Sequence, residues 1–298
     1  MTVENDTDTT TLGPSTWMER EVSHAARVDA ATAGHRSRRA RGEAHPVEDF
    51  LFSYYSTTPA QLRRWHPGVG VRLDGAATLE RAGWKHYRVV GDGVEVDVDA
   101  FLAARGRAVE FVGRLLSATA ARPARLGCFG LHEWAMVYRA GKGDVRHQQV
   151  PLRLGQAGTD AVVERHQIAC SHFDAFRFFT PDAVTRNAIQ PTRESQVTFE
   201  QPGCLHAGMD VYKWATKLAP LVPSDLTMDC FDLALEIREL DMQASPYDLS
   251  GYGLEPVRIE TAEGRTAYIE RQRAFAERSN ALRHRLLAVL DLVDDESP

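Results

Sequence analysis

The C-terminal part of the chain carries a long amphipathic pattern that constrains the fold more than any other feature. From Glu263 to Val293 apolar residues recur at helical spacing, and six lie on one face of the predicted helix: Ile269, Phe275, Leu282, Leu286, Val289 and Val293. Charges of both signs interleave elsewhere along it, as is typical of a solvated helix face. A second helix is predicted from Ser224 to Leu240, because Ser224 suits an N-cap and apolar residues again follow at helical spacing.

Shorter patterns precede these two helices. Helical spacing predicts five further helices, over residues 46–54, 58–65, 101–121, 127–138 and 206–218. Alternation of apolar and polar residues from Trp84 to Val98 predicts a hairpin that turns at Gly91-Asp92-Gly93. Short strands are predicted over 150–154 and 162–170. We therefore predict a mainly helical α+β fold, with residues 45–298 as a single catalytic or ligand-binding domain.

Residues 1–44 are predicted to be a disordered N-terminal arm. They are rich in Thr, Ala, Asp and Arg and contain few large apolar residues. The arm ends in a basic run, residues 35–41, which either contacts phosphates or is simply solvated.

Composition limits the classes of protein that the chain can belong to. No apolar run approaches the length of a membrane span, and the first residues lack the order of a signal peptide. We therefore expect a cytoplasmic protein without a membrane partner, and four cysteines in 298 residues are expected to remain reduced. A net charge of -6 argues against a protein that coats DNA but permits a local basic patch.

One stretch, from Arg165 to Trp214, combines aromatic rings with titratable groups more densely than a surface loop or a core segment does. Such a mixture fits the wall of a polar and apolar pocket. Asp174 and His172 lie there beside Phe173, Phe176 and Arg177. Whether this segment is extended or helical, an acid and a base adjoin rings that can stack on a planar substrate. The alternative is an Asp-Arg pair that supports an aromatic core.

The predicted helix over 206–218 carries a second set of candidates. His206, Asp210, Lys213 and Lys217 fall on one face at spacings of four, three and four residues. A base or nucleophile beside a carboxylate suits proton transfer or Schiff-base chemistry. The alternative is a polar helix face exposed to water.

Three Cys/His pairs suggest a metal site, since thiolate and imidazole are common zinc ligands. They are Cys128 with His132, His166 with Cys170, and Cys204 with His206. Zinc or iron bound by His132, His166 and His206 is one interpretation. The other is that these residues belong to the core, because free cysteines are often buried.

Several long motifs resemble a family of bacterial proteins described as 3-methyladenine DNA glycosylases. The resemblance extends from His45 to about Arg285, and the segments that carry it are residues 62–70 (LRRWHPGVG), 127–139 (GCFGLHEWAMVYR), 170–181 (CSHFDAFRFFTP), 201–207 (QPGCLHA), 209–215 (MDVYKWA) and 244–249 (ASPYDL).

The resemblance implies hydrolysis of the N-glycosidic bond of an alkylated base, with DNA that contains such bases as the partner. This reaction needs rings to hold a flipped base and a carboxylate at the sugar. The candidates for stacking are Phe173, Phe176 and Trp214, with Arg177 and Lys213 as further substrate contacts. The candidates for catalysis are Asp174, Glu133, Asp210 and His172. The alternatives are a metal-dependent small-molecule enzyme that uses the His/Cys/Asp cluster and a non-catalytic ligand-binding protein.

Overall fold

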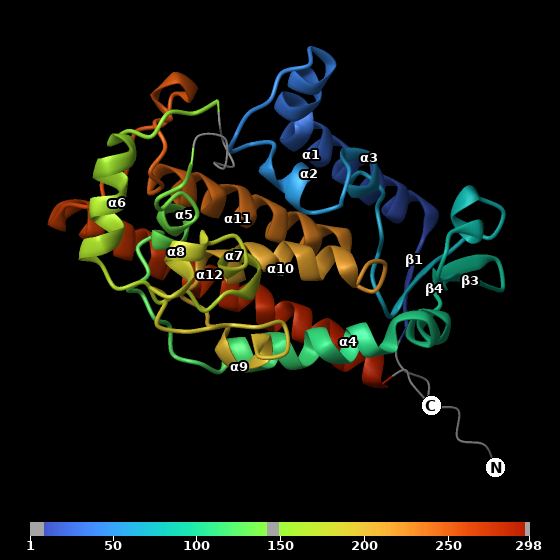
Figure 1. Cartoon of the computed structure of the whole chain (residues 1–298). Coiled ribbons are helices and arrows are strands. Elements are labelled where there is room, and N and C mark those ends of the chain that lie inside the picture. The colour runs from blue at the N-terminus through green and yellow to red at the C-terminus, as the bar shows by residue number, and fades with distance from the viewer. Residues whose placement is uncertain (1–8, 142–148, 296–298) are drawn as a thin grey trace.

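Four long helices form the centre of the molecule in the computed structural model, which describes residues 9–141 and 149–295 (Figure 1). They are α4 (Val98–Ala120), α10 (Leu205–Lys217), α11 (Ser224–Gln243) and α12 (Ala262–Asp295). Helix α10 packs against both α11 and α12, and α12 packs against α4. The predicted mainly helical α+β fold, in a single domain with a long C-terminal helix, is confirmed.

Helix α10 is buried on almost every side. Residues 205–212 are all buried, including the polar His206 and Asp210. Gly208 permits close packing against α11, because a Cβ atom there would lie 2.9 Å from Cδ1 of Ile237. A polar side chain on such a helix needs a partner inside the protein, since an unpaired buried charge costs several kcal/mol.

A small sheet lies at one end of the helices, with strand order β1-β2-β4-β3. Its strands are β1 (Thr10–Leu12), β2 (Val71–Leu73), β3 (Tyr87–Val90) and β4 (Gly93–Val96). β1 pairs in parallel with β2, and the other two pairings are antiparallel. The β3–β4 hairpin confirms the prediction from alternation, and its turn contains Gly91 at a φ of 62°.

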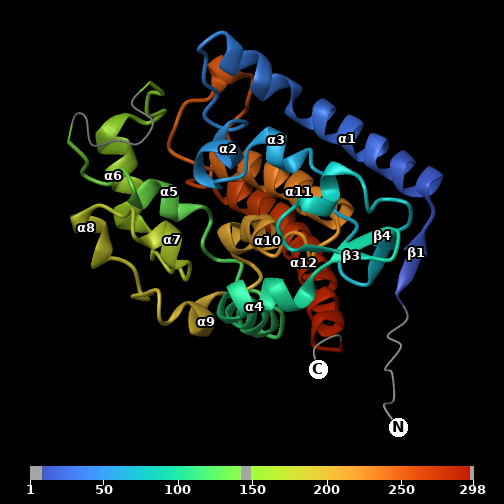
Figure 2. The same cartoon turned by 90° about the vertical axis from the view of Figure 1, so that its right-hand side faces the viewer.

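The prediction of a disordered N-terminal arm is wrong over most of its length. Residues Pro14–Ala40 form helix α1, which packs against α3 (Pro59–Leu62) and α11 along the outside of the bundle (Figure 2). Trp17 and Val28 are buried, and Nε1 of Trp17 donates to the carbonyl of Asp74 at 3.0 Å. The few buried residues of α1 form one stripe, so a low apolar content concealed a packed helix; residues 1–8 lie outside the described part of the chain.

The basic run at the end of α1 pairs within the protein. Arg38 forms ion pairs with Glu48 and Asp49, and His35 also contacts Asp49. These contacts fasten the end of α1 to α2 (Phe50–Tyr54), whose N-cap is Asp49.

Short helices connect the central elements. They are α5 (Leu131–Ala135), α6 (Gly155–Arg165), α7 (Phe173–Phe176), α8 (Pro181–Val184) and α9 (Gln196–Phe199), with 3-10 turns at Glu80–Gly83 and Ser250–Tyr252.

Three local predictions are corrected by these connections. The predicted strand over 162–170 begins inside α6, because Val162 and Val163 bury one face of a helix despite their β-branched side chains. The predicted strand over 150–154 is reduced to a bridge between Leu152 and Tyr247. The predicted helix over 127–138 is reduced to α5, since Phe129 and Gly130 adopt positive φ.

Within the described residues, no helix is both long enough and apolar enough to cross a lipid bilayer.

Candidate functional site

Seven ionisable side chains meet in the interior, at α5, α10 and α11 and beside α7 and α9. We call them the buried cluster: His132, Glu133, His172, Glu200, His206, Asp210 and Asp241. Each is at most 5% exposed. Their ligand-type atoms form two groups, one of four residues and one of three.

The first group comprises His132, Glu133, His206 and Asp241. Nε2 of His132 lies 2.7 Å from Oδ1 of Asp241, and the rings of His132 and His206 meet edge to face at 4.4 Å. Arg238 donates to Asp241 at 2.7 Å and to Glu133 at 3.1 Å. Burial, followed by the charge of Asp241, raises the pKa of Glu133.

The second group comprises His172, Glu200 and Asp210. Nε2 of His172 lies 3.3 Å from Asp210 and 3.4 Å from Glu200. Burial would lower the pKa of His172, but the two carboxylates outweigh it and raise the pKa. The ring of His172 stacks on that of His206 at 5.4 Å, which joins the two groups.

Lys213 connects the buried cluster to the protein surface. Its ammonium donates to Asp210 at 2.8 Å and to Asp174 at 2.9 Å. Burial would lower the pKa of Lys213, but Asp210 and Asp174 outweigh it and raise the pKa. Lys213 is therefore a permanent cation at neutral pH, which argues against its use as a Schiff-base amine.

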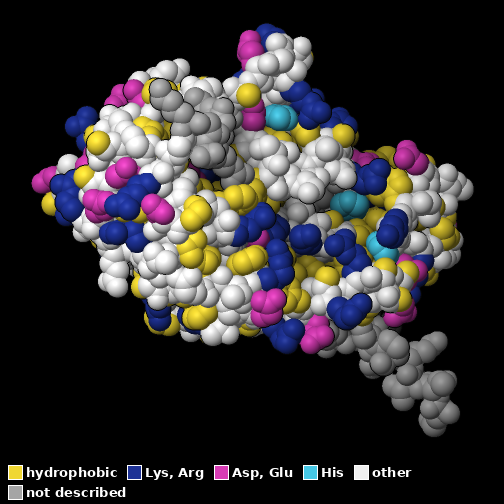
Figure 3. Space-filling view, viewed as in Figure 1, with side chains coloured by type: hydrophobic (Ala, Val, Ile, Leu, Met, Phe, Trp, Pro, Cys, Tyr) yellow, Lys and Arg dark blue, Asp and Glu magenta, His cyan; other side chains and the backbone are white. Residues whose placement is uncertain are grey.

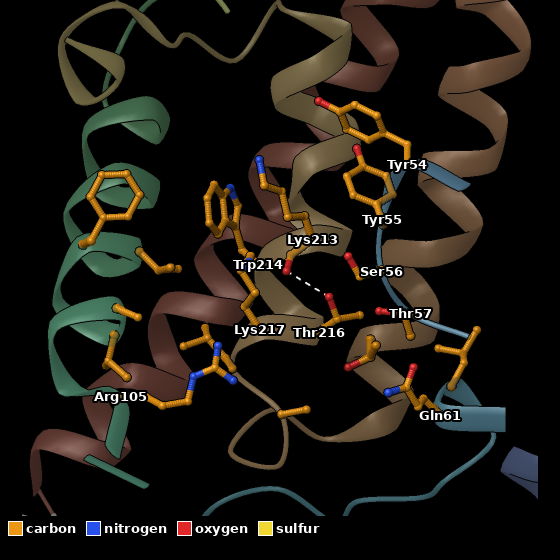
Figure 4. Close-up of a pocket in the computed structure, with 18 of the residues that line it drawn as sticks. Tyr54, Tyr55, Ser56, Thr57, Gln61, Arg105, Lys213, Trp214, Thr216 and Lys217 are labelled. Carbon is orange, nitrogen blue, oxygen red and sulfur yellow. Dashed lines mark hydrogen bonds between the residues drawn. The ribbon is translucent and has the colours of Figure 1, made fainter. Parts of the chain in front are cut away.

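A cavity of about 910 Å³ opens beside Lys213, between the α2–α3 segment, α4 and α10. Figure 4 shows one wall carrying Tyr54, Tyr55 and Gln61, the opposite side carrying Arg105, and Lys213, Trp214 and Lys217 of α10 between them. Among the described residues, six cationic side chains line the cavity: Arg64, Arg105, Arg177, Arg193, Lys213 and Lys217. Six aromatic side chains of the same part of the chain also line it: Tyr54, Tyr55, Phe101, Phe111, Phe178 and Trp214.

Asp174 is the one carboxylate among the described residues that line this cavity. Burial would raise its pKa, but the hydrogen bond and charge of Lys213 outweigh it and lower the pKa. Arg177 lies 3.3 Å from Asp174, a spacing of three residues that helix α7 brings together. The carboxylate is therefore ionised at neutral pH and suits stabilisation of positive charge rather than donation of a proton.

The floor of the cavity adjoins the buried cluster. Three residues that line the cavity donate to carboxylates of the cluster: Tyr55 to Asp210 at 2.9 Å, Gln196 to Glu200 at 2.5 Å, and Lys213 to Asp210. A single layer of side chains therefore separates the cavity from the buried cluster.

The structure brings together most of the candidates predicted from sequence. Asp174, Arg177, Lys213 and Trp214 line the cavity. His172, Glu133, His132, His206 and Asp210 lie beneath it in the buried cluster. The expectation of a solvent-exposed polar face on α10 is wrong, because His206 and Asp210 are buried.

Other candidates lie elsewhere. Phe173 and Phe176 do not line the cavity; Arg193 covers the ring of Phe173, and Phe176 packs against Phe179. His166 is in neither group of the buried cluster, and its Nδ1 contacts the carbonyl of Val162 at 2.7 Å. No cysteine of the described residues joins either group, and burial raises the pKa of Cys170, so a thiolate ligand is not favoured.

Four important residues were missed from sequence: Tyr55, Glu200, Arg238 and Asp241. The signal for two of them was present, because Arg238 and Asp241 follow Ala234 and Ile237 by four residues and so continue the apolar face of α11. A charged residue on a buried face requires an internal partner. No comparable local signal marks Tyr55 or Glu200.

The fold and site define a mainly helical α+β protein with a cationic, ring-lined cavity above a buried His/carboxylate cluster. Comparison of the chain with protein-family models, with curated proteins and with solved structures finds no match.

Proposed function

We propose that the chain hydrolyses the N-glycosidic bond of an alkylated nucleobase in DNA. The observation that carries this proposal is the composition of the cavity, where six cations, six aromatic rings and one ionised carboxylate face a common space. This combination matches the three parts of such a substrate: phosphates, a planar base and a sugar that becomes cationic during the reaction.

The cations supply the affinity for phosphate. Six lysines and arginines line the cavity against one carboxylate, although the whole chain has a net charge of -6. Lysine and arginine side chains gather around a hollow in the middle of the face shown in Figure 3. Guanidinium groups bind phosphate oxygens in pairs, and their charge releases counterions from DNA.

The rings supply a place for the base. Trp214 and Phe111 meet edge to face at 6.0 Å on one side of the cavity, and Tyr54 lies on the other. An enzyme that acts on a base in DNA extrudes it from the stack and holds it against aromatic side chains. A volume of about 910 Å³ accommodates a nucleotide.

Asp174 is the proposed catalytic carboxylate. Cleavage of the N-glycosidic bond passes through a sugar with oxocarbenium character, which an ionised carboxylate stabilises. Lys213 and Arg177 orient Asp174. Because Lys213 remains protonated, the reaction is expected to be simple hydrolysis, leaving an abasic site and a free base.

The test is release of free methyladenine from DNA treated with a methylating agent, measured by chromatography. The native protein is expected to release the base, and Asp174→Asn is expected to lower kcat about 100-fold or more while the protein remains folded. The matched control is Glu110→Gln, an exposed carboxylate on α4, which should leave the rate unchanged. Absence of any release by the folded native protein would contradict the proposal.

A further inference from the structure

The first group of the buried cluster has no role in the proposed hydrolysis, yet its geometry is that of a binding site. His132, Glu133, His206 and Asp241 come from three helices, and one ligand-type atom from each lies within 4.8 Å of the others. All four are at most 5% exposed. We propose that these four side chains bind one divalent transition-metal ion of the Zn(II) or Fe(II) type.

His206 is the residue that points to a ligand. Its Nδ1 is fully buried and has no hydrogen-bond partner among the described residues. The ring of His206 lies against those of His132 and His172, with ring centroids 4.4 and 5.4 Å away. A buried polar atom without a partner is unfavourable, and a metal–nitrogen bond would satisfy it.

The donor set favours a transition metal over calcium or magnesium. Two imidazoles and two carboxylates provide two nitrogen and two oxygen ligands, and imidazole suits zinc and iron, whereas calcium and magnesium prefer oxygen alone. Four protein ligands also match the number that a closed zinc site uses.

The charge of the group is consistent with a cation. Two carboxylates, Glu133 and Asp241, face a single guanidinium, Arg238, which bonds to both. The guanidinium carbon of Arg238 also lies 3.9 Å from the ring centroid of Phe50. Hydrogen bonds of this kind orient carboxylate ligands at metal sites.

The second group is not proposed as a ligand set, although it is adjacent. Nδ1 of His172 already has a partner, since the backbone amide of Ala175 donates to it at 3.3 Å. Nε2 of His172 lies 3.3 Å from Asp210 and 3.4 Å from Glu200. His172 is as buried as His206 and stacks on it, and therefore serves as a matched control.

The experiment measures metal bound per chain in the full-length protein. The protein is purified without metal-affinity resin or chelators for elemental analysis, and chelator-treated protein is then titrated with Zn(II), or with Fe(II) under anaerobic conditions. We expect one ion per chain, with affinity lowered about 100-fold or more by His206→Ala and retained in His172→Gln. Glu133→Gln, which keeps side-chain volume, provides a second ligand variant if His206→Ala fails to fold.

Three outcomes would overturn the assignment. They are no stoichiometric binding by the folded native protein, equal binding by the native and His206→Ala proteins, and loss of binding in His172→Gln equal to that in His206→Ala. Metal content is measured without DNA, so this result stands apart from the outcome of the glycosylase assay.

Discussion

His66 lines the cavity with its ring between two other aromatic side chains. Nδ1 lies 2.9 Å from the hydroxyl of Tyr87, and the ring of Trp84 meets it edge to face. Burial, assisted by the charges of Arg81 and Arg64, lowers the pKa of His66 to about 3. The residue is therefore a neutral hydrogen-bonding group throughout the physiological range.

This lowered pKa predicts a defined loss of stability in acid. Below about pH 6.5 the unfolded chain binds a proton at His66 and the folded chain does not, so the free energy of unfolding falls by up to about 1.4 kcal/mol per pH unit. The loss continues down to the folded pKa of about 3. His66→Gln should show a shallower decline between pH 7 and pH 5 in urea denaturation. Identical pH profiles for the two proteins would contradict the prediction.

The positive charge of Lys213 compensates the negative charges of two carboxylates. It contacts Asp174 and Asp210 at hydrogen-bond distance, and the side chain of Asp210 is only 1% exposed. Lys213→Met leaves buried negative charge unpaired and should lower the free energy of unfolding by about 3–5 kcal/mol. Chemical denaturation provides the measurement.

The control for that variant is Lys217→Met, one turn further along α10. Lys217 also lines the cavity but is exposed, so its replacement should change stability by less than about 0.5 kcal/mol. Adding Asp210→Asn to Lys213→Met should recover part of the loss, because one unpaired charge is removed. Equal losses for Lys213→Met and Lys217→Met would show that Lys213 does not compensate buried charge.

Helix α1 is the element whose structure differs most from the prediction made from sequence. Its buried stripe contains Trp17, His24, Val28 and Thr32, at spacings of seven, four and four residues. Between these positions the helix carries mostly alanine and charged residues, so its composition resembles that of a disordered segment. The contacts that stabilise α1 come from α3, α11 and the backbone of Asp74.

Replacement of Trp17 tests whether α1 belongs to the folded core. Trp17 is 2% exposed and its neighbour Met18 is 46% exposed. Trp17→Ala should lower the free energy of unfolding by about 3–5 kcal/mol, because it leaves a cavity and removes a hydrogen bond. Met18→Ala should have little effect. If thermal unfolding of both variants matches the native protein, α1 does not contribute to the core.

At the scale of the whole molecule, charge is distributed unevenly. The chain has a net charge of -6, yet the cavity collects six cations around one carboxylate. A local positive field of this kind attracts an anionic ligand even when the protein as a whole is acidic. The same field should weaken as salt is added, because mobile ions screen exposed charges.

Substitution of two arginines of α4 distinguishes the effect of the local positive field from that of the overall charge. Arg105 lines the cavity, whereas Arg107 is exposed and does not. Arg105→Ala should weaken binding of a DNA oligonucleotide and reduce the slope of log affinity against log salt by about 1. Arg107→Ala should leave both unchanged in fluorescence anisotropy. Equal effects of the two substitutions would place the DNA outside this cavity.

Local patterns in the sequence were enough to predict the framework. The helices over 224–240 and 263–293 and the β3–β4 hairpin were predictable, because their periodicity depends on residues a few positions apart. The segments that carry the family resemblance also contained five residues of the candidate site: Asp174, His172, His206, Asp210 and Lys213. What these residues contact was not predictable, since a helical or extended segment around Asp174 was equally compatible with the spacing.

Only the tertiary structure decided which side chains share a space. His132 and Asp241 are 109 positions apart, and Tyr55 and Asp210 are 155 apart. It also placed Phe178 rather than Phe173 in the cavity and folded α1 onto the bundle. The physical reason is that periodicity sets which face of an element is apolar, whereas the partner of a buried charge depends on how distant elements pack.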